Sequence, residues 1–293
     1  MTSPVIGFAG LGVMGEPICL NILKKTGADI RVFDPKPEPV TRLVQAGATR
    51  TVSVAELAAS VDILFLSLPG GPQVEAVVLG SEGVLEHGAR GLTVIDMSTT
   101  PVGLTRELAE KLAVKGIRFA DAPVARTRQA AENGTLSIMV GGPATVFDQI
   151  RPILAHAATD ITHCGEIGCG QVVKILNNMV LIETVVALSE ALSLGRAAGV
   201  DPVMLFDTLS KGSADSFALR NHGMKAMLPD NFPKGAFPTD YALKDISYAL
   251  DLAAFTGFRA PGAELARARM EKARAAGFAE EYFPVLARVT DRV

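Results

Sequence analysis

The chain has 293 residues, of which 48% are hydrophobic and 20% are charged, and its formal net charge is −3. This composition is typical of a globular protein with a sizeable core and excludes an intrinsically disordered chain. Because so small a charge creates no strong field, we expect neither nucleic acid nor a membrane surface as a partner.

The cysteines indicate a reducing compartment and no metal centre. There are three of them, Cys19, Cys164 and Cys169, and their odd number and spacing do not suit a disulfide scaffold. His163 lies beside Cys164, but the spacing to Cys169 matches no standard zinc site. The N-terminal residues lack a basic segment followed by an apolar one, so we expect a cytoplasmic protein without a signal peptide.

The first half of the chain alternates short apolar runs with helical patterns. The runs predicted to be strands are Val5–Ala9, Ile30–Phe33, Ile63–Leu68, Leu92–Ile95, Ile117–Ala120 and Leu136–Val140. The helical patterns between them include Glu16–Lys25, Val40–Ala46 and Leu104–Lys115. Continuous apolar strands that alternate with helices predict an α/β fold, in which helices cover both faces of a doubly wound, Rossmann-like parallel sheet.

The pattern changes near residue 165 and becomes helical to the end. Residues Gln171–Ala198 read as one long helix that is apolar nearly all round, which predicts burial on most faces, in part against another subunit. This segment also contains Lys174 and Glu183, which makes a membrane span an unfavourable interpretation. Further helical patterns follow at Pro202–Ser210, Ala242–Phe255 and Ala263–Ala275. We therefore predict a dinucleotide-binding domain at 1–164 and an all-helical substrate and oligomerisation domain at 165–293.

A glycine motif follows the first predicted strand directly and opens a helix. The motif is G-x-G-x-x-G, formed by Gly10, Leu11, Gly12, Val13, Met14 and Gly15. Glycines at these positions let the backbone turn sharply and approach a pyrophosphate, and the helix N-terminus offers free N–H groups. A glycine-rich turn without a ligand is the alternative, but strand, motif and helix in register favour a dinucleotide site.

Asp34 ends the second predicted strand, where a carboxylate can accept hydrogen bonds from the ribose of the cofactor. A carboxylate there would repel the additional phosphate of NADP, so we expect NAD, although the nearby Lys36 leaves NADP possible. A helix cap or turn residue before Pro35 is the competing interpretation of Asp34.

Several motifs along nearly the whole chain together resemble one enzyme family. They are Met14-Gly15-Glu16-Pro17, Leu66-Ser67-Leu68-Pro69, Ile95-Asp96-Met97-Ser98-Thr99, Asp121-Ala122-Pro123-Val124, Gly134-Thr135-Leu136-Ser137, Met139-Val140-Gly141-Gly142, Gly168-Cys169-Gly170-Gln171-Val172-Val173-Lys174 and Lys244-Asp245. This combination resembles the 3-hydroxyisobutyrate dehydrogenase family of β-hydroxyacid dehydrogenases. The resemblance implies a Rossmann-like domain, a helical domain similar to that of 6-phosphogluconate dehydrogenase, an active site in the cleft between them, and a homodimer or homotetramer.

Lys174 matches the catalytic lysine of that family. A lysine in an apolar helix loses hydration, which lowers its pKa and favours proton exchange near neutral pH. Asn178 lies four residues further on the same helix face, matches the family asparagine and could hold the substrate oxygen. From the residues alone, a lysine whose amine reaches solvent at the helix start is an equally good interpretation, and the resemblance favours catalysis.

The resemblance also implies roles for residues in other segments. It places Leu68, Pro69, Thr99 and Lys244 at the cofactor. It places Phe237 and Asp245 at the substrate site, and Ser213 in a small polar segment that could bind an anion. A helix cap for Thr99, an exposed ion pair for Lys244 and Asp245, and a plain turn for Ser213 remain the alternatives.

The segment after Asp121-Ala122-Pro123-Val124 departs from the family pattern of Ser-Gly-Gly. Here it reads Ala125-Arg126-Thr127, so a serine hydroxyl is lost and a guanidinium is introduced. Arginine offers a planar set of donors that suits a carboxylate or a sulfonate, and the Arg-Thr pair is similar to a segment of sulfolactaldehyde reductases. Ala125, Arg126 and Thr127 are therefore candidate substrate-binding residues. An ion pair between domains or a cofactor contact is the alternative for Arg126.

These observations predict an oxidoreductase that transfers hydride between NAD(H) and a small anionic β-hydroxyacid or semialdehyde. Reduction of sulfolactaldehyde is one candidate, and 3-hydroxyisobutyrate, tartronate semialdehyde and succinic semialdehyde are others. A non-catalytic dinucleotide-binding scaffold is the alternative of another class, but such relatives lack the lysine that this chain keeps. Imine reductases usually have another residue in place of this lysine as well.

Overall fold

The computed structural model describes residues 3–290 and separates into two compact units, Met1–Lys174 and Ile175–Val293. We call them the N-terminal unit and the C-terminal unit. The division falls inside one long helix, α9 (Cys169–Ala197), whose first residues belong to the N-terminal unit. The functional boundary near residue 164 stays a prediction.

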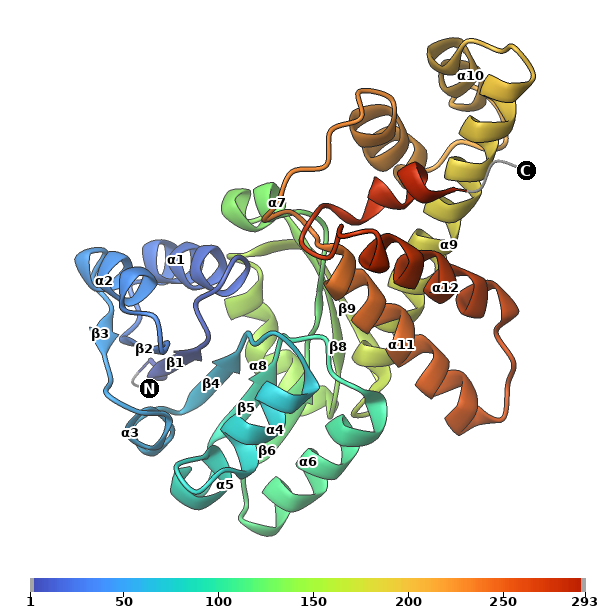
Figure 1. Ribbon diagram of the computed structural model, residues 1–293. Helices are drawn as coiled ribbons and strands as arrows, with labels where there is room; N and C mark the ends of the chain where they lie inside the picture. The colour runs from blue at the N-terminus through green and yellow to red at the C-terminus, as the bar shows by residue number, and fades with distance from the viewer. Residues whose placement is uncertain (1–2, 291–293) are drawn as a thin grey trace. The chain divides into compact units, whose positions relative to one another are not determined.

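The N-terminal unit is built on one sheet, in which the described residues contribute nine strands (Figure 1). Its order is β3-β2-β1-β4-β5-β6-β8-β7, and β9 also pairs with β8. The strands are β1 (Ile6–Ala9), β2 (Ile30–Phe33), β3 (Thr49–Arg50), β4 (Ile63–Leu66), β5 (Thr93–Asp96), β6 (Arg118–Asp121), β7 (Val124–Ala125), β8 (Leu136–Gly141) and β9 (Ala158–Gly165).

The first six strands are parallel, and their order reverses between β1 and β4. The chain runs outward from β1 through β2 to β3 and then returns to β4 on the other side of β1. Such a reversal leaves a crevice at the carboxyl ends of the two central strands, which is where doubly wound sheets bind their ligands. The topology therefore places any ligand site beside the turns that follow Ala9 and Leu66.

The other edge of the sheet is mixed, which the sequence did not indicate. β8 runs antiparallel to β6 and β7 and parallel to β9. The eight-residue β9 was not predicted because its side chains are mostly polar or exposed, and β3 and β7 have only two residues each. A strand at a sheet edge does not need the apolar run by which a buried strand is found in a sequence.

Helices cover both faces of this sheet, as the sequence predicts. They are α1 (Gly15–Thr26), α2 (Pro37–Gln45), α3 (Val54–Ala59), α4 (Gly71–Leu79), α5 (Val84–His87), α6 (Val102–Val114), α7 (Arg128–Asn133) and α8 (Ala144–Leu154). Successive strand residues point to opposite faces. Phe8 and Phe65 stack in the core that includes α1, α2, α7 and α8, whereas Leu64 and Leu66 enter the core of α3 to α6.

In the residues that the structure describes, the regular elements of the C-terminal unit are all helices, apart from an isolated bridge between Pro238 and Tyr282. Beyond α9 it contains α10 (Pro202–Leu209), η1 (Leu219–Met227), α11 (Thr239–Thr256), α12 (Pro261–Ala275) and η2 (Phe283–Val289). η1 is a π-helix and η2 a 3-10 helix, and the sequence predicted neither. The separate core of this unit packs around Phe206, Phe283 and Ile246.

Helix α9 runs for 29 residues, close to the predicted Gln171–Ala198. By length and composition it could cross a membrane, and part of its apolar surface is exposed in the single chain, including Val180 and Leu194. Yet its polar side chains have protein partners: Asn178 bonds to α11, and Glu190 pairs with Arg269 of α12. Such contacts are typical of the core helix of a folded domain.

Candidate nucleotide and active site

The glycine loop between β1 and α1 is shaped by close backbone contacts. Gly10 has a φ of +91°, and a Cβ there would lie 2.3 Å from the carbonyl oxygen of Ser67. A Cβ on Gly15 would lie 2.1 Å from the carbonyl oxygen of Gly10. These two glycines are therefore required by the fold itself, because no side chain fits at either position.

Gly12 is different, because nothing in the protein requires a glycine there. A Cβ on Gly12 would meet no atom within 4 Å, and its φ lies outside the left-handed range. In the described part of the chain, the N–H groups of Gly12, Val13 and Met14 have no hydrogen-bond partner, and they precede the N-terminus of α1. A pyrophosphate fits this arrangement, because it can approach the backbone at Gly12 and bind the free N–H groups at the helix N-terminus.

Asp34 follows β2 and contacts this loop. Its Oδ2 accepts a hydrogen bond of 2.6 Å from the N–H of Leu11, and its Oδ1 accepts one of 2.8 Å from the N–H of Lys36. The carboxylate thus forms the local turn that was the competing interpretation. Each of its oxygens has a further lone pair for a ribose hydroxyl.

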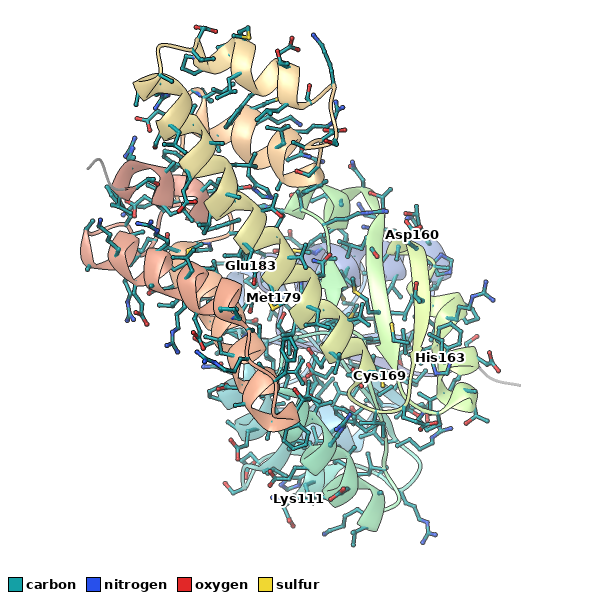
Figure 2. The ribbon with its side chains drawn as sticks, turned by 90° about the vertical axis from the view of Figure 1, so that its right-hand side faces the viewer. Lys111, Asp160, His163, Cys169, Met179 and Glu183 are labelled. Carbon is teal, nitrogen blue, oxygen red and sulfur yellow. The ribbon has the colours of Figure 1, made fainter. Side chains whose placement is uncertain are left out.

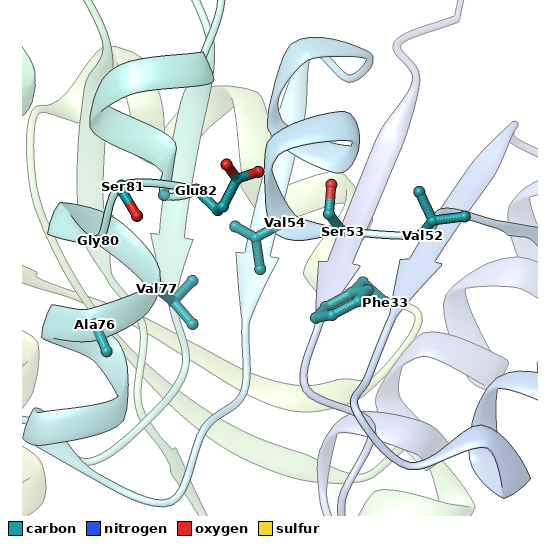
Figure 3. A pocket seen from close by; sticks show the side chains of 10 residues that line it. Phe33, Val52, Ser53, Val54, Ala76, Val77, Gly80, Ser81 and Glu82 are labelled. Atoms are coloured by element: carbon teal, nitrogen blue, oxygen red, sulfur yellow. The ribbon is translucent and has the colours of Figure 1, made fainter.

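A pocket of about 380 Å³ lies beside the end of β2, in the N-terminal unit (Figure 3). Phe33, Val54, Ala76 and Val77 line it with apolar surface, and Ser53 and Glu82 add polar groups to the lining. A flat aromatic group such as adenine suits a pocket of this kind, which lies next to Asp34, the predicted ribose contact. These lining residues were not predicted from the sequence, although Phe33 directly precedes Asp34.

The loops after β4 and β5 lie next to the glycine loop in the sheet order. The N–H of Leu68 donates to Ser98 Oγ over 2.9 Å, and a Cβ on Gly10 would lie 2.9 Å from the Leu68 side chain. Thr99 follows Ser98 and is half-buried, and Pro69 follows Leu68 and is exposed. The loops after β1, β4 and β5 therefore place their predicted cofactor residues side by side at the carboxyl ends of these three strands.

The predicted catalytic residues occupy the first turns of α9. Lys174 and Asn178 are one helical turn apart on one face. Asn178 is buried, its Nδ2 donates to Asp245 Oδ2 over 2.6 Å, and its Oδ1 accepts a bond of 3.0 Å from Asn177. The amide of Asn178 therefore has a fixed orientation.

Asp245 connects Asn178 to Lys244 on α11. Lys244 Nζ lies 3.0 Å from Asp245 Oδ1 and also faces the rings of Tyr241 and Tyr248, at 5.4 and 5.2 Å from their centroids. The alternative of an exposed surface pair is therefore wrong for Asp245, which is buried. An amine held by a carboxylate and two rings is kept in one place.

Phe237 and Ser213 do not share this cluster of contacts. Phe237 packs edge-on against Phe283 with centroids 5.4 Å apart. Ser213 is exposed in the connection between α10 and η1, where Asp215 pairs with Arg220. In the described residues the Ser213 side chain has no hydrogen bond, so the turn interpretation is sufficient for it.

Arg126 is bound within the N-terminal unit. Its guanidinium donates to the Thr135 carbonyl at 2.6 Å, to Thr159 Oγ1 at 2.8 Å and to Asp160 at 2.7 Å. Asp160 lies on β9, near the edge of the sheet (Figure 2). Thr135 directly precedes β8, and Thr159 lies in β9 with Asp160, so this arginine joins the two paired strands.

The neighbours of Arg126 also have structural contacts. Ala125 pairs with Ser137 in the β7–β8 ladder, and the hydroxyl of Thr127 caps α7 by accepting a bond from the N–H of Ala130. The backbone of Arg126 has a φ of +85°, a conformation that favours glycine, which is the residue of the family pattern at this position. The departure from Ser-Gly-Gly therefore keeps the backbone shape of a glycine loop.

Comparison with known proteins identifies the family. Residues 5–165 match the NAD-binding domain of 6-phosphogluconate dehydrogenase, and residues 168–289 match the NAD-binding region of NADP-dependent 3-hydroxyisobutyrate dehydrogenase. The chain is 36% identical to 2-(hydroxymethyl)glutarate dehydrogenase of Eubacterium barkeri, over 98% of this chain and 95% of that protein. It is 37% identical to 3-hydroxyisobutyrate dehydrogenase of Pseudomonas aeruginosa, over 89% of each.

A solved structure agrees with these matches. The 3-hydroxyisobutyrate dehydrogenase of Mycobacterium tuberculosis, determined with L-serine, has a TM-score of 0.90 and 31% identity, over 98% of this chain and 99% of that one. The chain belongs to the 3-hydroxyisobutyrate dehydrogenase family. It is an NAD(P)-dependent oxidoreductase of the β-hydroxyacid dehydrogenase class, which confirms the predicted enzyme class, cofactor class and Rossmann-like fold.

Proposed function

We propose that this enzyme interconverts a small anionic β-hydroxyacid and its semialdehyde with NAD(H), with Lys174 as the proton-transfer residue. The observation that carries the proposal is the full-length similarity to dehydrogenases of such acids, together with the lysine and asparagine one turn apart at the start of α9. Lys174 would protonate the carbonyl oxygen during reduction and accept the hydroxyl proton during oxidation.

The compounds named with the three similar proteins share one chemical core. 3-Hydroxyisobutyrate, 2-(hydroxymethyl)glutarate and L-serine each carry a hydroxymethyl group on the carbon next to a carboxylate. They differ in the third substituent, which is a methyl, a carboxyethyl or an ammonium group. The proposed substrate is therefore a 3-hydroxy acid of this kind, and its variable substituent sets specificity.

The bound nicotinamide cofactor supplies or removes the hydride. Gly12 and the free N–H groups of the glycine loop would hold its pyrophosphate, and Asp34 its ribose. We propose NAD rather than NADP, because a phosphate on that ribose would meet the Asp34 carboxylate. Leu68, Pro69 and Thr99 would line the nicotinamide side, and Lys244 would approach the cofactor.

Asn178 would hold the substrate oxygen, since its amide is already oriented by Asp245 and Asn177. Phe237, Asp245 and Ser213 remain proposed substrate residues on the strength of the resemblance. Arg126, with Ala125 and Thr127, would recognise the anionic end of the substrate. Its guanidinium would then exchange Asp160 for the anion. Such an exchange costs little, because an exposed ion pair contributes little to stability.

Sulfolactaldehyde is the second candidate substrate, and the Arg126-Thr127 pair favours it. Tartronate and succinic semialdehydes are further candidates, each with a carboxylate for the same arginine. We also propose that the enzyme is cytoplasmic and forms a homodimer or homotetramer. The exposed Val180 and Leu194 of α9 support burial of this helix against a second copy.

Replacing Lys174 with methionine tests the proposal directly. We expect turnover to be lost while NADH still binds, because methionine keeps the apolar stem and removes the amine that moves the proton. Turnover is measured with a panel of 3-hydroxy acids and semialdehydes, and NADH binding by fluorescence. A Lys174→Met enzyme with normal turnover would rule out the assigned role.

The cofactor preference has its own experiment. Asp34→Ala should reduce the ratio of kcat/KM for NAD to that for NADP, since the charge that repels the phosphate is removed. An unchanged ratio would mean that another residue contacts the ribose.

A further inference from the structure

Two buried side chains, to which the resemblance assigned no role, hold the start of α9. The first is Asp121, the last residue of β6, which is fully buried. Its Oδ1 accepts a hydrogen bond of 2.7 Å from the N–H of Gly168, and its Oδ2 accepts one of 2.8 Å from the N–H of Gln171. One carboxylate thus binds N–H groups just before and inside the first turn of α9.

The second side chain is Gln171 itself, which is also fully buried. Its Oε1 accepts a bond of 3.0 Å from the N–H of Thr100, and its Nε2 donates to the Ser98 carbonyl over 2.8 Å. Thr100 Oγ1 in turn donates to Asp96 at the end of β5. The amide therefore joins α9 to the loop after β5, which also binds the N–H of Leu68.

The backbone packs closely around Asp121 and the start of α9. A Cβ on Gly141 would lie 2.6 Å from Asp121 Oδ1, and a Cβ on Gly170 would lie 2.7 Å from Asp121 Oδ2 and 2.4 Å from the Met139 carbonyl oxygen. The helix therefore starts in direct contact with the end of β8, with the carboxylate wedged between them. Any shift of the carboxylate would move the helix start.

We propose that Asp121 and Gln171 are positioning residues that fix the start of α9 and thereby the place of the Lys174 amine. This inference rests on the proposed function of Lys174. Gln171 precedes Lys174 by three residues, so both side chains project from nearly the same face of one helix. A proton-transfer group must be placed within hydrogen-bond reach of the reacting oxygen, and both side chains belong to the same unit as Lys174.

The electrostatics of Asp121 give the proposal a signature in pH. Burial raises the pKa of Asp121 to about 6, the nearby charge of Asp96 adds to this, and the bonds from Gly168 and Gln171 oppose it. Protonation below that pH turns one acceptor into a donor that faces an N–H, so one of the two bonds is lost. Asp96 on β5 and Cys164 on β9 interact electrostatically with Asp121, and Cys169 lies in the first turn of α9. Further out, Arg106 on α6 bonds to the Ile167 carbonyl and His163 on β9 to the Gly142 carbonyl.

The experiment compares Gln171→Glu and Asp121→Asn with wild type. Glutamate keeps the size of Gln171 but loses the donor to Ser98. Asparagine leaves one N–H of the α9 start without an acceptor. Because misplacement by about 1 Å can cost roughly 100-fold in rate, we expect kcat to fall between about tenfold and 100-fold in each variant. NADH affinity should stay near that of wild type.

Matched controls use the same changes elsewhere in the N-terminal unit. Gln149→Glu on α8 and Asp62→Asn just before β4 should leave kcat unchanged. Wild-type kcat should fall as the pH drops through about 6, and Asp121→Asn should remove this acid limb, whereas His163→Gln should keep it. A residue with only a structural role would lower stability without changing the pH profile.

The outcomes separate this inference from the proposed function. Normal turnover in Lys174→Met would refute the role of Lys174 itself. An inactive Lys174→Met enzyme, combined with wild-type kcat and pH profile in both Gln171→Glu and Asp121→Asn, would overturn only the positioning role. If those two variants fail to fold, the dependence of the wild-type kcat on pH is the test. A kcat that does not fall as the pH drops through about 6 would contradict the proposal.

Discussion

Two loops of the N-terminal unit both contain a residue with a positive φ, but one uses glycine there and the other arginine. The loop Gly10–Gly15 follows β1 and uses glycine wherever the backbone turns sharply or another segment approaches. The loop that contains Arg126 follows β7, and there an arginine takes up a positive φ of 85°. The first loop remains open for a ligand, whereas the side chain of the second makes two hydrogen bonds to β9 and one to the Thr135 carbonyl just before β8.

The difference separates what the fold requires from what a ligand requires. Gly10 and Gly15 are needed to build the loop, while Gly12 is needed only if something else approaches it. A left-handed residue with a side chain costs about 1 kcal/mol, so Arg126 must be retained for its side chain rather than for its backbone. Substitutions in the two loops should therefore separate folding from binding.

The largest effect is expected from Gly15→Ala. Its Cβ would lie 2.1 Å from the Gly10 carbonyl oxygen, and backbone cannot yield as a flexible side chain can. We expect a loss of stability of roughly 1–3 kcal/mol, the usual range for overpacking, together with loss of NADH binding. Thermal unfolding and fluorescence titration measure the two effects. A variant that melts and binds like wild type would show that the loop can relax around the methyl group.

Gly12→Ala should affect binding alone. The added methyl group meets no protein atom, so we expect a change in unfolding free energy within about 0.5 kcal/mol. It projects into the space proposed for the pyrophosphate, and we expect NADH affinity to fall by at least about tenfold, which corresponds to 1.4 kcal/mol. Unchanged affinity would place the pyrophosphate elsewhere and remove the contrast between Gly12 and Gly15.

The same two loops show how far the sequence predicts the molecule. The glycine loop was predicted because its motif follows a buried strand and opens a helix, both of which have clear apolar patterns. The contacts of Arg126 were not predicted from the sequence, because its partner Asp160 lies on β9, an edge strand without an apolar run. An arginine in a sequence indicates that its side chain binds an anion, but not whether that anion is a ligand or a carboxylate of the protein itself.

The joint at α9 gives the same lesson. Lys174 is conspicuous as a charge in an apolar helix, whereas Asp121 and Gln171 acquire meaning only when β6, the loop after β5 and α9 meet. Their contacts join residues about 50 to 70 positions apart in the chain. No local pattern encodes such pairs, so the sequence predicted the proposed catalytic group but not the residues that hold it.

Arg126→Gly tests the second loop. Glycine removes the backbone strain of about 1 kcal/mol, and the lost ion pair is exposed, so we expect little net change in stability. If Arg126 recognises the anion, KM should rise for a 3-hydroxy acid but not for the corresponding uncharged alcohol. Steady-state kinetics with the two compounds measure this difference. A rise of the same size for both would mean that Arg126 only joins β8 and β9.

The smallest effect is expected from Asp160→Asn, which probes the competition between protein and substrate for one guanidinium. The hydrogen bond from Thr159, followed by the one from Arg126, holds the pKa of Asp160 below its usual range, so the residue is ionised at neutral pH and competes as a full charge. Asparagine keeps the size but removes the charge. Because the pair is exposed and contributes little, we expect KM for the anionic substrate to fall by no more than a few-fold, with kcat unchanged. A higher KM would instead show that Asp160 orients Arg126 for binding the substrate. The contacts of Arg126 with β9 would then support anion binding rather than compete with it.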